Sequence, residues 1–474
     1  MSITFTDENI AKLFGAQDAE SESIERLKEY FLKKDTYSSV MSDLKVRVLV
    51  GHKGTGKSAL FKIAINEDQA NNRLPILIKP DDIKEITVDS ISFNQRVRQW
   101  KEGLISIIKE KVFETFNFHD DKGKYIPKTL YILSYLHDTF SNIKSYANLD
   151  PTKKILYDNF LKSRQIIVYI DDLDRGWNGT ISDIENISAL LNAIRDLSND
   201  NEGLLFRISL RTSVYYLVRT SDESTDKIES SVVWCDWENH EIFVLLIKRI
   251  LTYFNIGFDE ETLLKTSQSS LSQKLSYVMD TTFYGKGKWM NKPMYNVLLS
   301  LVRRRPRDMV KLCTLAAQQA AKDRSEKIMT HHFDSIFSEY SQGRIQDTIN
   351  EYKSEIPNIK SLLFGMKPTS AQQKSGKGFL YTYDELIKKL RIVRNSGNIT
   401  NIKGEKLTED QLAEFLYKIN FITATKTTPQ GIDRKYFETN QYLLSAKVNF
   451  GYKWEVHPAF RWVLQPDFDR YMKE

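Results

Sequence analysis

The stretch VRVLVGHKGTGKS, residues 46–58, decides the fold of this chain. It opens with a short run rich in β-branched residues that ends at a glycine, which predicts a buried strand leading into a tight loop. The next eight residues, Gly51 to Ser58, fit the pattern G-x-x-x-x-G-K-[ST] in full, and a segment of helical periodicity follows. A strand, a glycine-rich loop and a helix in this order predict a phosphate-binding loop, called the P-loop below.

The spacing of the P-loop residues follows from the chemistry of a triphosphate. Glycines let the backbone curl so that successive N–H groups face the β-phosphate, and the helix that follows points the positive end of its dipole at the same oxygens. Lys57 is predicted to reach the β- and γ-phosphates, and the Ser58 hydroxyl is predicted to bind Mg²⁺. The residues expected to contact the nucleotide are Gly51, Gly54, Thr55, Gly56, Lys57, Ser58 and Ala59. ATP is the expected nucleotide, and GTP remains open.

A second half of the site follows the apolar run QIIVYI, residues 165–170, which predicts a buried strand beside the P-loop. This run leads directly into the acids Asp171, Asp172 and Asp174. A carboxylate at the tip of such a strand is suited to hold the water shell of magnesium, and we expect Asp171 to do so. Asp172 is expected to orient or deprotonate the water that attacks the γ-phosphate. Asp174 competes for that role, although capping of the following helix is the preferred interpretation for it.

Two groups of arginines are further candidates. Arg211 follows the apolar run LLFRISL, residues 204–210, and either senses the γ-phosphate or lies on the surface. Four arginines between Arg303 and Arg307 open a downstream helix, and Arg307 is predicted to reach the nucleotide from a lid or from a neighbouring subunit. The alternatives for this run are a charged helix start, with Asp308 in its first turn, and a surface that binds an acidic partner.

Apolar strands alternate with helical segments, which predicts an α/β fold with a parallel sheet covered by helices on both faces. The expected strands are 46–51, 74–79, 165–170 and 204–210. The predicted domains are an N-terminal helical segment at 1–40, a P-loop core at 41–238 with a helical insertion at about 91–164, a helical lid at 239–350, and a small α+β domain at 351–474. Local predictions are an amphipathic helix at 18–34, a linker at 367–378, a capping box from Thr408 to Gln411, and a β-hairpin formed by 436–450 and 452–458.

Composition narrows the class of protein. The chain has 474 residues, of which 41% are hydrophobic and 27% charged, and no apolar run approaches the roughly 20 residues that cross a bilayer. A polar, acidic N-terminus and two distant cysteines, Cys235 and Cys313, predict a cytoplasmic protein with reduced thiols and no membrane partner. The net charge of +6 comes from residues 351–474, which hold 20 Lys and Arg against 14 Asp and Glu. That excess suits nucleic acid or an acidic partner, although a solubilising surface explains it as well.

The segments GHKGTGKSAL, IDDLDRGW, RTSVYY and RRRPRDMVKLC, in this order, resemble bacterial P-loop ATPases related to the STAND and KAP NTPases. These belong to the additional-strand class and are similar to AAA+ proteins of the origin-recognition type. The resemblance covers residues 12–350. It implies Lys57, Ser58 and Asp171 for ATP and Mg²⁺, Asp172 for catalysis and Arg307 as a sensor-like residue, together with a helical lid and a winged-helix-like C-terminal domain. The acids lack the Asp-Glu ending of standard AAA+ proteins, which favours the STAND/KAP side.

Relatives of this group act as nucleotide-controlled switches in bacterial conflict systems, including phage defence, and work with a separate effector. The first hypothesis is therefore a regulatory ATPase that acts through a homo-oligomer or a protein partner. A DNA-associated ATPase, which would use its basic C-terminal domain on duplex DNA, is the second. A nucleotide-binding scaffold that hydrolyses little is the third.

Overall fold

The computed structural model describes residues 3–16, 21–83, 86, 92–116, 136–137, 151–221, 226–374, 378–428, 431–444 and 451–465. The chain divides into two compact units, of which one is Ala19–Cys235 and the other combines Met1–Asp18 with Asp236–Glu474. The P-loop lies in the first unit, and the arginine run at 303–307 lies in the second.

The first unit is built on a five-stranded parallel sheet in the order β2-β3-β4-β1-β5. Its strands are β1 (Val46–Val50), β2 (Leu74–Ile78), β3 (Ile166–Ile170), β4 (Leu204–Leu210) and β5 (Val232–Trp234). The four expected strands are confirmed within one residue at each end, and the short edge strand β5 was not predicted. The sequence placed β3 beside the P-loop strand, which is wrong, because β4 lies between β1 and β3 and pairs with both.

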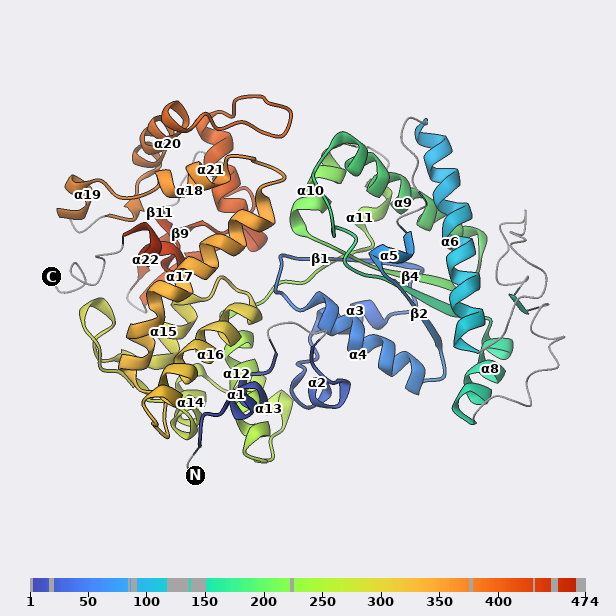
Figure 1. Cartoon of the computed structure of the whole chain (residues 1–474), viewed down its shortest axis with the longest axis horizontal. Helices are drawn as coiled ribbons and strands as arrows, with labels where there is room; N and C mark the ends of the chain where they lie inside the picture. The colour runs from blue at the N-terminus through green and yellow to red at the C-terminus, as the bar shows by residue number, and fades with distance from the viewer. Residues whose placement is uncertain are drawn as a thin grey trace. The chain divides into compact units, whose positions relative to one another are not determined.

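Helices cover both faces of this sheet, as the sequence predicts (Figure 1). Helices α2 (Ile24–Tyr30), α3 (Asp35–Met41) and α4 (Lys57–Ala70) lie on one face, and α6 (Phe93–Thr115) and α9 (Ile181–Asp200) lie on the other. The unit also contains α5 (Pro80–Ile83), α8 (Pro151–Ser163), α10 (Thr212–Ser221) and α11 (Asp226–Glu229). The expected helical insertion at 91–164 contains α6 and α8, and residues 117–135 and 138–150 of it lie outside the described ranges.

The amphipathic helix expected at 18–34 is wrong in its extent, because α2 covers only Ile24–Tyr30. The Ser23 side chain accepts a hydrogen bond from the Arg26 N–H and caps the helix there. At the other end the chain becomes extended at Phe31, whose ring packs edge-on against Tyr37 of α3, 5.9 Å between centroids. The apolar residues of the predicted helix therefore lie in α2 and in the extended segment that leads from it to α3.

The second unit is mainly helical. Its longer helices are α12 (Asn239–Tyr253), α16 (Pro306–Lys322) and α17 (Thr330–Tyr352), and the N-terminal helix α1 (Asp7–Phe14) packs against α12 and α16. Its short helices are α13 (Glu260–Lys265), α14 (Gln268–Ser272), α15 (Met294–Leu301), α18 (Ile359–Gly365), α19 (Ser370–Lys374) and α22 (Arg461–Leu464). A small hairpin joins β6 (Thr282–Phe283) to β7 (Lys292–Pro293). Part of the expected linker at 367–378 is α19.

The C-terminal part of this unit holds an antiparallel sheet in the order β10-β9-β11-β8, with β8 (Leu380–Tyr381), β9 (Ile422–Thr428), β10 (Gly431–Lys435) and β11 (Lys453–Val456). Helices α20 (Tyr383–Gly397) and α21 (Glu409–Lys418) pack on each other, and the predicted capping box of Thr408 and Gln411 is confirmed at the start of α21. The predicted hairpin of 436–450 with 452–458 is wrong. Instead, β11 pairs with β9, where Trp454 lies opposite Ala424, and Phe437–Thr439 forms a 3₁₀ turn.

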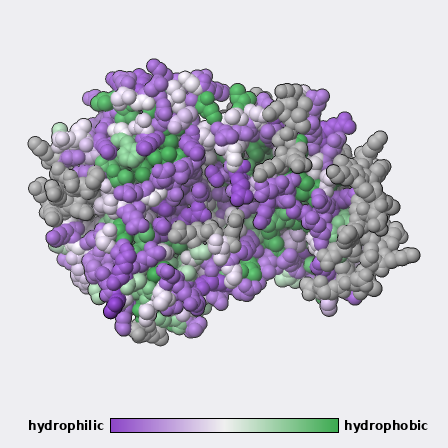
Figure 2. All heavy atoms as spheres, viewed as in Figure 1, coloured by the Kyte–Doolittle hydropathy of each residue, from purple (hydrophilic) through white to green (hydrophobic). Residues whose placement is uncertain are grey.

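The surface visible in Figure 2 is mainly hydrophilic, with apolar residues in separate patches. Within the described ranges, every helix is too short or too polar to span a bilayer. Cys235 and Cys313 are not joined in a disulfide, and both are buried.

Candidate functional site

The P-loop connects the end of β1 to the start of α4, and its glycines are needed for different reasons. A Cβ at Gly51 would lie 2.8 Å from Thr55 Oγ1 and 3.0 Å from Cys235 Cβ, closer than packed atoms approach. Gly54 and Gly56 have φ of +85° and +94°, a backbone region that glycine adopts without steric cost. The loop can therefore curl only with glycine at these positions, as its pattern predicts.

Lys57 is the first residue of α4, and its side chain lies over the loop. Its Nζ donates to the carbonyl oxygens of Gly51, 2.7 Å away, and His52, 3.1 Å away. Ser58 and Ala59 follow in the first turn and are partly exposed, whereas Thr55 is buried and donates its hydroxyl to the His52 carbonyl. A flexible ammonium, a hydroxyl and the N-terminus of a 14-residue helix thus share one small region.

The acids after β3 are arranged around Asp171. Its Oδ1 accepts hydrogen bonds from the Asp172 N–H, at 2.9 Å, and from the hydroxyl of Ser209 on β4. Ser209 was not predicted as a site residue. Its signal in the sequence is a hydroxyl within the otherwise apolar end of LLFRISL, but that pattern alone does not say which neighbouring strand the hydroxyl faces.

The buried Asp174 forms an ion pair with Arg211, a partly exposed residue that follows β4. The interpretation of Asp174 as a helix cap is wrong, because α9 begins at Ile181 and its cap is Thr180, which forms a capping box with Asp183. Arg211 is not a free surface arginine, since its guanidinium holds a carboxylate from the neighbouring strand end. Breaking the pair is unfavourable, because the Asp174 carboxylate would remain buried without its counter-charge.

Asp172 combines a left-handed backbone conformation with a carboxyl group whose pKa is raised. It has a left-handed backbone, with φ of +57°, and is partly exposed. Burial raises the pKa of its carboxyl, the charges of Asp174 and Asp171 raise it further, and Arg211 and Arg175 oppose that rise. A carboxylate with a raised pKa is a stronger base than an ordinary aspartate, which suits proton removal from water.

Arg211→Ala is expected to shift the acid limb of phosphate release to higher pH by up to about one unit. Arg211 lowers the pKa of Asp172, so its removal raises that pKa and reduces the ionised fraction of Asp172 at any given acidic pH. The pH profile of kcat/KM measures the shift. Arg211→Lys keeps the charge and should restore the limb, and equal profiles for all three proteins would contradict this coupling.

The arginine run at 303–307 is mostly structural. Arg303 is buried and pairs with Asp308 at 2.8 Å, and Arg305 is buried and pairs with Glu351 at 2.8 Å. The interpretation of these two as a surface for an acidic partner is therefore wrong. The Arg304 guanidinium lies over the Tyr436 ring, 4.5 Å from its centroid. Arg307 is partly exposed on the first turn of α16, and its role at the nucleotide stays a prediction.

A cluster outside the P-loop has the composition of a metal site but the wrong hydrogen bonding. Asp323, His331 and His332 bring their ligand atoms within 4.8 Å of one another. The Nδ1 of His332 accepts from the Met329 N–H, so a neutral ring carries its proton on Nε2 and donates it to Asp323, 3.1 Å away. Because that nitrogen has no lone pair to offer, the three groups form a hydrogen-bonded cluster rather than a three-ligand site.

Comparisons with known proteins match one segment of the chain to a family and find distant likenesses among solved structures. Residues 260–349, in the second unit, match the family described as the FunZ-associated C-terminal helical domain. No curated protein matches the chain.

Among solved structures the chain is similar to the Walker-type ATPase of Pyrococcus abyssi, at 13% identity over 95% of this chain and 96% of that one, with a TM-score of 0.40. It is also similar to the ORC2 protein of Aeropyrum pernix in its ADPNP–ADP complexes, at 11% identity over 96% and 93%, with a TM-score of 0.42. The RuvB Holliday junction branch migration motor of Thermotoga maritima matches at 11% identity over 90% and 98%, with a TM-score of 0.34. These likenesses are distant, and the α/β P-loop NTPase fold of the first unit is established by its parallel sheet, strand order and P-loop.

Proposed function

We propose that the chain is a magnesium-dependent ATPase that acts as a nucleotide-controlled switch. The observation that carries the proposal is the register of three adjacent strands. Val50 pairs with Leu210 and Ile170 pairs with Ile208, so β1, β4 and β3 end within a few residues of one another. The carboxyl-terminal ends of these three strands therefore hold the P-loop, Ser209 with Arg211, and the acids after β3. Proteins with open α/β sheets bind their ligands at this end of the strands.

The residues at this edge fit ATP and Mg²⁺. The positive φ angles of Gly54 and Gly56 give the loop its curled backbone, and Lys57 has a flexible side chain that can move from loop carbonyls to phosphate oxygens. Ser58 and Asp171 would hold Mg²⁺, since hydroxyl and carboxylate oxygens are ligands that it prefers. The ion would neutralise charge on the phosphates. Asp172 would take the proton of the attacking water, and the Asp174–Arg211 pair would keep the acids in position.

The switch is the finer part of the proposal. Residues 41–238 would form the ATPase core, 239–350 a helical lid that carries Arg307, and 351–474 a winged-helix-like domain. The strand β4 inserted between β1 and β3 supports the additional-strand class, and the STAND/KAP resemblance supports a switch that acts through a homo-oligomer or an effector partner in antiphage defence. ATP binding would favour one arrangement of core and lid, and hydrolysis would reset it.

Lys57→Ala is expected to weaken ATP binding by about 10²-fold and to abolish phosphate release, because the ammonium neutralises the β- and γ-phosphates. Lys53→Ala is the matched control, since Lys53 is an exposed lysine of the same loop and its removal should change affinity by less than about threefold. Calorimetric titration with ATP and with GTP measures both variants and the nucleotide preference. Equal ATP affinity in wild type and Lys57→Ala would refute the site.

The DNA-associated alternative is favoured by the basic C-terminal region but opposed by its helices. In a winged-helix arrangement α21 would approach DNA, and this helix starts with Glu409 and Asp410 and carries exposed Glu414. The basic residues Arg391 and Arg394 of α20 both pair with Glu409. Retention of duplex DNA on filters, weakening by about one log unit per phosphate contact for each tenfold rise in salt, would restore this alternative.

A further inference from the structure

The segment YGKGKWMNK, residues 284–292, leads from the end of β6 to the first residue of β7 and is called the hairpin loop below. Its backbone has a defined form, because Gly287–Trp289 is a 3₁₀ turn and the Asn291 N–H donates to the Phe283 carbonyl, 2.8 Å away. The loop contains three lysines and no acidic residue, so its side chains carry a charge of +3. The hairpin loop is therefore a compact basic element of the second unit.

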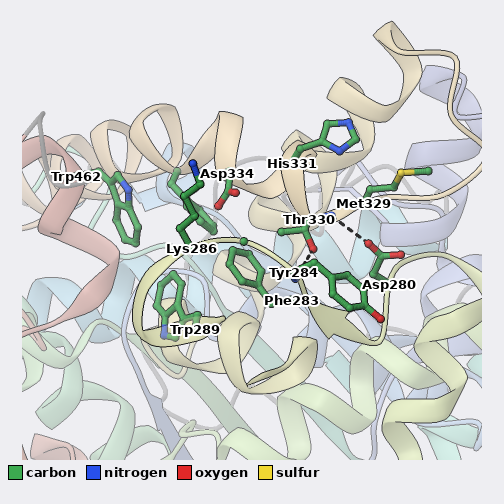
Figure 3. Close-up of a pocket in the computed structure, with 12 residues that line it drawn as sticks. Asp280, Phe283, Tyr284, Lys286, Trp289, Met329, Thr330, His331, Asp334 and Trp462 are labelled. Carbon is green, nitrogen blue, oxygen red and sulfur yellow. Dashed lines mark hydrogen bonds between the residues drawn. The ribbon is translucent and has the colours of Figure 1, made fainter. Parts of the chain in front are cut away.

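Trp289 fixes the hairpin loop to the body of the unit. Its ring centroid lies 5.7 Å from the centroids of both Phe337 and Trp462, and 6.1 Å from that of Phe283 (Figure 3). Phe283 and Phe337 are buried, whereas Trp289 is partly exposed. Because these ring contacts already hold the loop, its other side chains are presented to solvent with little backbone ordering left to lose on binding.

Large apolar side chains and lysines are exposed together at this loop. The exposed fractions are 69% for Tyr284 and 56% for Met290. Met329, just before α17, is 42% exposed and lies close to Tyr284, because the Tyr284 N–H donates to the hydroxyl of the next residue, Thr330, at 3.0 Å (Figure 3). The lysines of the loop are exposed as well. We call this set the hairpin surface, and it consists of Tyr284, Lys286, Lys288, Met290, Lys292 and Met329.

The hairpin surface keeps its positive charge beside two acids. Asp280 and Asp334 line a cavity next to the loop, and both are engaged within the chain, Asp280 by the Thr330 N–H at 3.2 Å. In the part of the chain that the structure describes, the three lysines of the loop form no ion pair with an acid. Three lysines against these two acids leave the region positive, so it favours an anionic partner.

The composition of the hairpin surface indicates the class of that partner. Lysine is depleted in protein–protein interfaces, whereas tyrosine, and lysine with its apolar stem, are typical of the boundary between a bilayer and water. A nucleic acid would use the lysines, but its phosphates would leave Met290 and Met329 without an apolar partner. An anionic bilayer offers phosphates to the lysines and the edge of its acyl layer to the apolar side chains.

We propose that the hairpin surface binds the anionic surface of a lipid bilayer. Tyr284, Met290 and Met329 enter the headgroup layer, and the lysines bind lipid phosphates around them. The sequence predicted no membrane partner from the lack of a run that crosses a bilayer, but a surface that lies on a bilayer needs no such run. The inference is independent of ATP hydrolysis, because the hairpin surface and the P-loop belong to different units.

Sedimentation with vesicles tests the proposal on the full chain. Vesicles of phosphatidylcholine with about one third phosphatidylglycerol should bind half of the protein at lipid concentrations on the order of millimolar. Vesicles of phosphatidylcholine alone should bind it at least about tenfold more weakly, because they offer the lysines no net negative charge. No sedimentation at about 10 mM anionic lipid, or equal binding to both kinds of vesicle, would overturn the proposal.

Single lysine substitutions measure the contribution of charge. Lys286→Ala and Lys288→Ala should each weaken binding to the anionic vesicles about fivefold, whereas Lys286→Arg should retain it. Lys360→Ala is the comparison, because Lys360 is exposed on α18, outside the hairpin loop, and its loss should change binding by less than about twofold. If Lys286→Ala and Lys288→Ala bound as tightly as Lys360→Ala, the lysines of the loop would not be the contact.

Tyr284→Ala measures the apolar contribution. It should weaken binding about fivefold at any salt concentration, because its ring enters the headgroup layer, whereas the loss in Lys286→Ala should shrink as salt rises. Equal binding of Tyr284→Ala and wild type would contradict entry of the loop into that layer.

Nucleic acid is the alternative occupant, and a thymidine oligonucleotide is its probe. Retention of this strand on filters by wild type, lost in Lys286→Ala and Lys288→Ala and found without any vesicle binding, would assign the surface to a phosphate backbone and overturn the proposal.

Discussion

Asp172→Asn is expected to lower the rate of phosphate release by about 10²- to 10³-fold while ATP binds as tightly as before. In the proposed mechanism the amide cannot take the proton of the attacking water, whereas the P-loop and Asp171 would keep their contacts with the nucleotide and Mg²⁺. The folded protein should lose no stability, because burial and the charges of Asp174 and Asp171 disfavour the ionised Asp172. Phosphate release, ATP titration and thermal unfolding measure the three quantities.

Two comparisons make this result specific. Asp174→Asn removes the buried carboxylate that pairs with Arg211, so it should lower the unfolding temperature as well as the rate. Glu202→Gln changes an exposed acid just before the start of β4, at the end of the strand away from Arg211, and should leave phosphate release unchanged. If Asp174→Asn abolished release without loss of stability while Asp172→Asn remained active, the catalytic role would belong to Asp174.

Asp308→Ala is expected to reduce the free energy of unfolding of the second unit by about 3 to 5 kcal/mol. Asp308 is 1% exposed and binds both the Nε and Nη2 of Arg303, at 2.8 and 3.0 Å, and also Arg344. Its removal takes away the counter-ion of the buried Arg303 and one of the two carboxylates that pair with Arg344. Denaturant unfolding followed by tryptophan fluorescence measures the loss.

The matched control is Asp347→Ala, because Asp347 pairs with the same Arg344 at 2.9 Å but is 41% exposed. An exposed partner contributes at most about 1 kcal/mol, so the two substitutions should differ clearly. If both substitutions reduced the free energy of unfolding equally, the burial of Asp308 would not explain the stabilising effect of its ion pair.

The pair also gives acid sensitivity with a definite sign. Burial alone would raise the pKa of Asp308, but Arg303 and Arg344 outweigh it and hold the pKa well below the ordinary value. A carboxyl whose pKa is lowered by folding contributes stability above its unfolded pKa and loses that contribution as pH falls through the folded value. Asp308→Ala should therefore lack the part of the acid destabilisation that wild type shows below about pH 4.

Patterns that depend on near neighbours predicted much of the fold. The strands β1, β2, β3 and β4 are short apolar runs bounded by polar residues, and the P-loop is a continuous pattern of eight residues. The capping box at Thr408 is local in the same way. Such features need only a few consecutive residues, so the sequence contains all the information that decides them.

Features that depend on distant partners could not be predicted this way. LLFRISL shows that Arg207 and Ser209 are polar residues in an apolar strand, but their partners come from elsewhere. Arg207 donates to the carbonyls of Val40 and Leu44 before β1, and Ser209 donates to Asp171 after β3. The C-terminal hairpin failed for the same reason, because β11 found β9 rather than the segment that precedes it.

The sequence by itself determined the P-loop, the alternation of strands and helices, and the acids that end β3, because each follows from local geometry and chemistry. Only the tertiary structure decided that β4 separates the P-loop strand from those acids, that Asp174 holds Arg211, and that Arg303 and Arg305 are buried in ion pairs. The physical reason is that the sequence shows a charged side chain but not its surroundings. The same arginine or aspartate can be solvated by water at the surface or paired with an opposite charge many positions away. Whether the side chain is solvated or paired depends on its burial, and burial results from the packing of the whole chain.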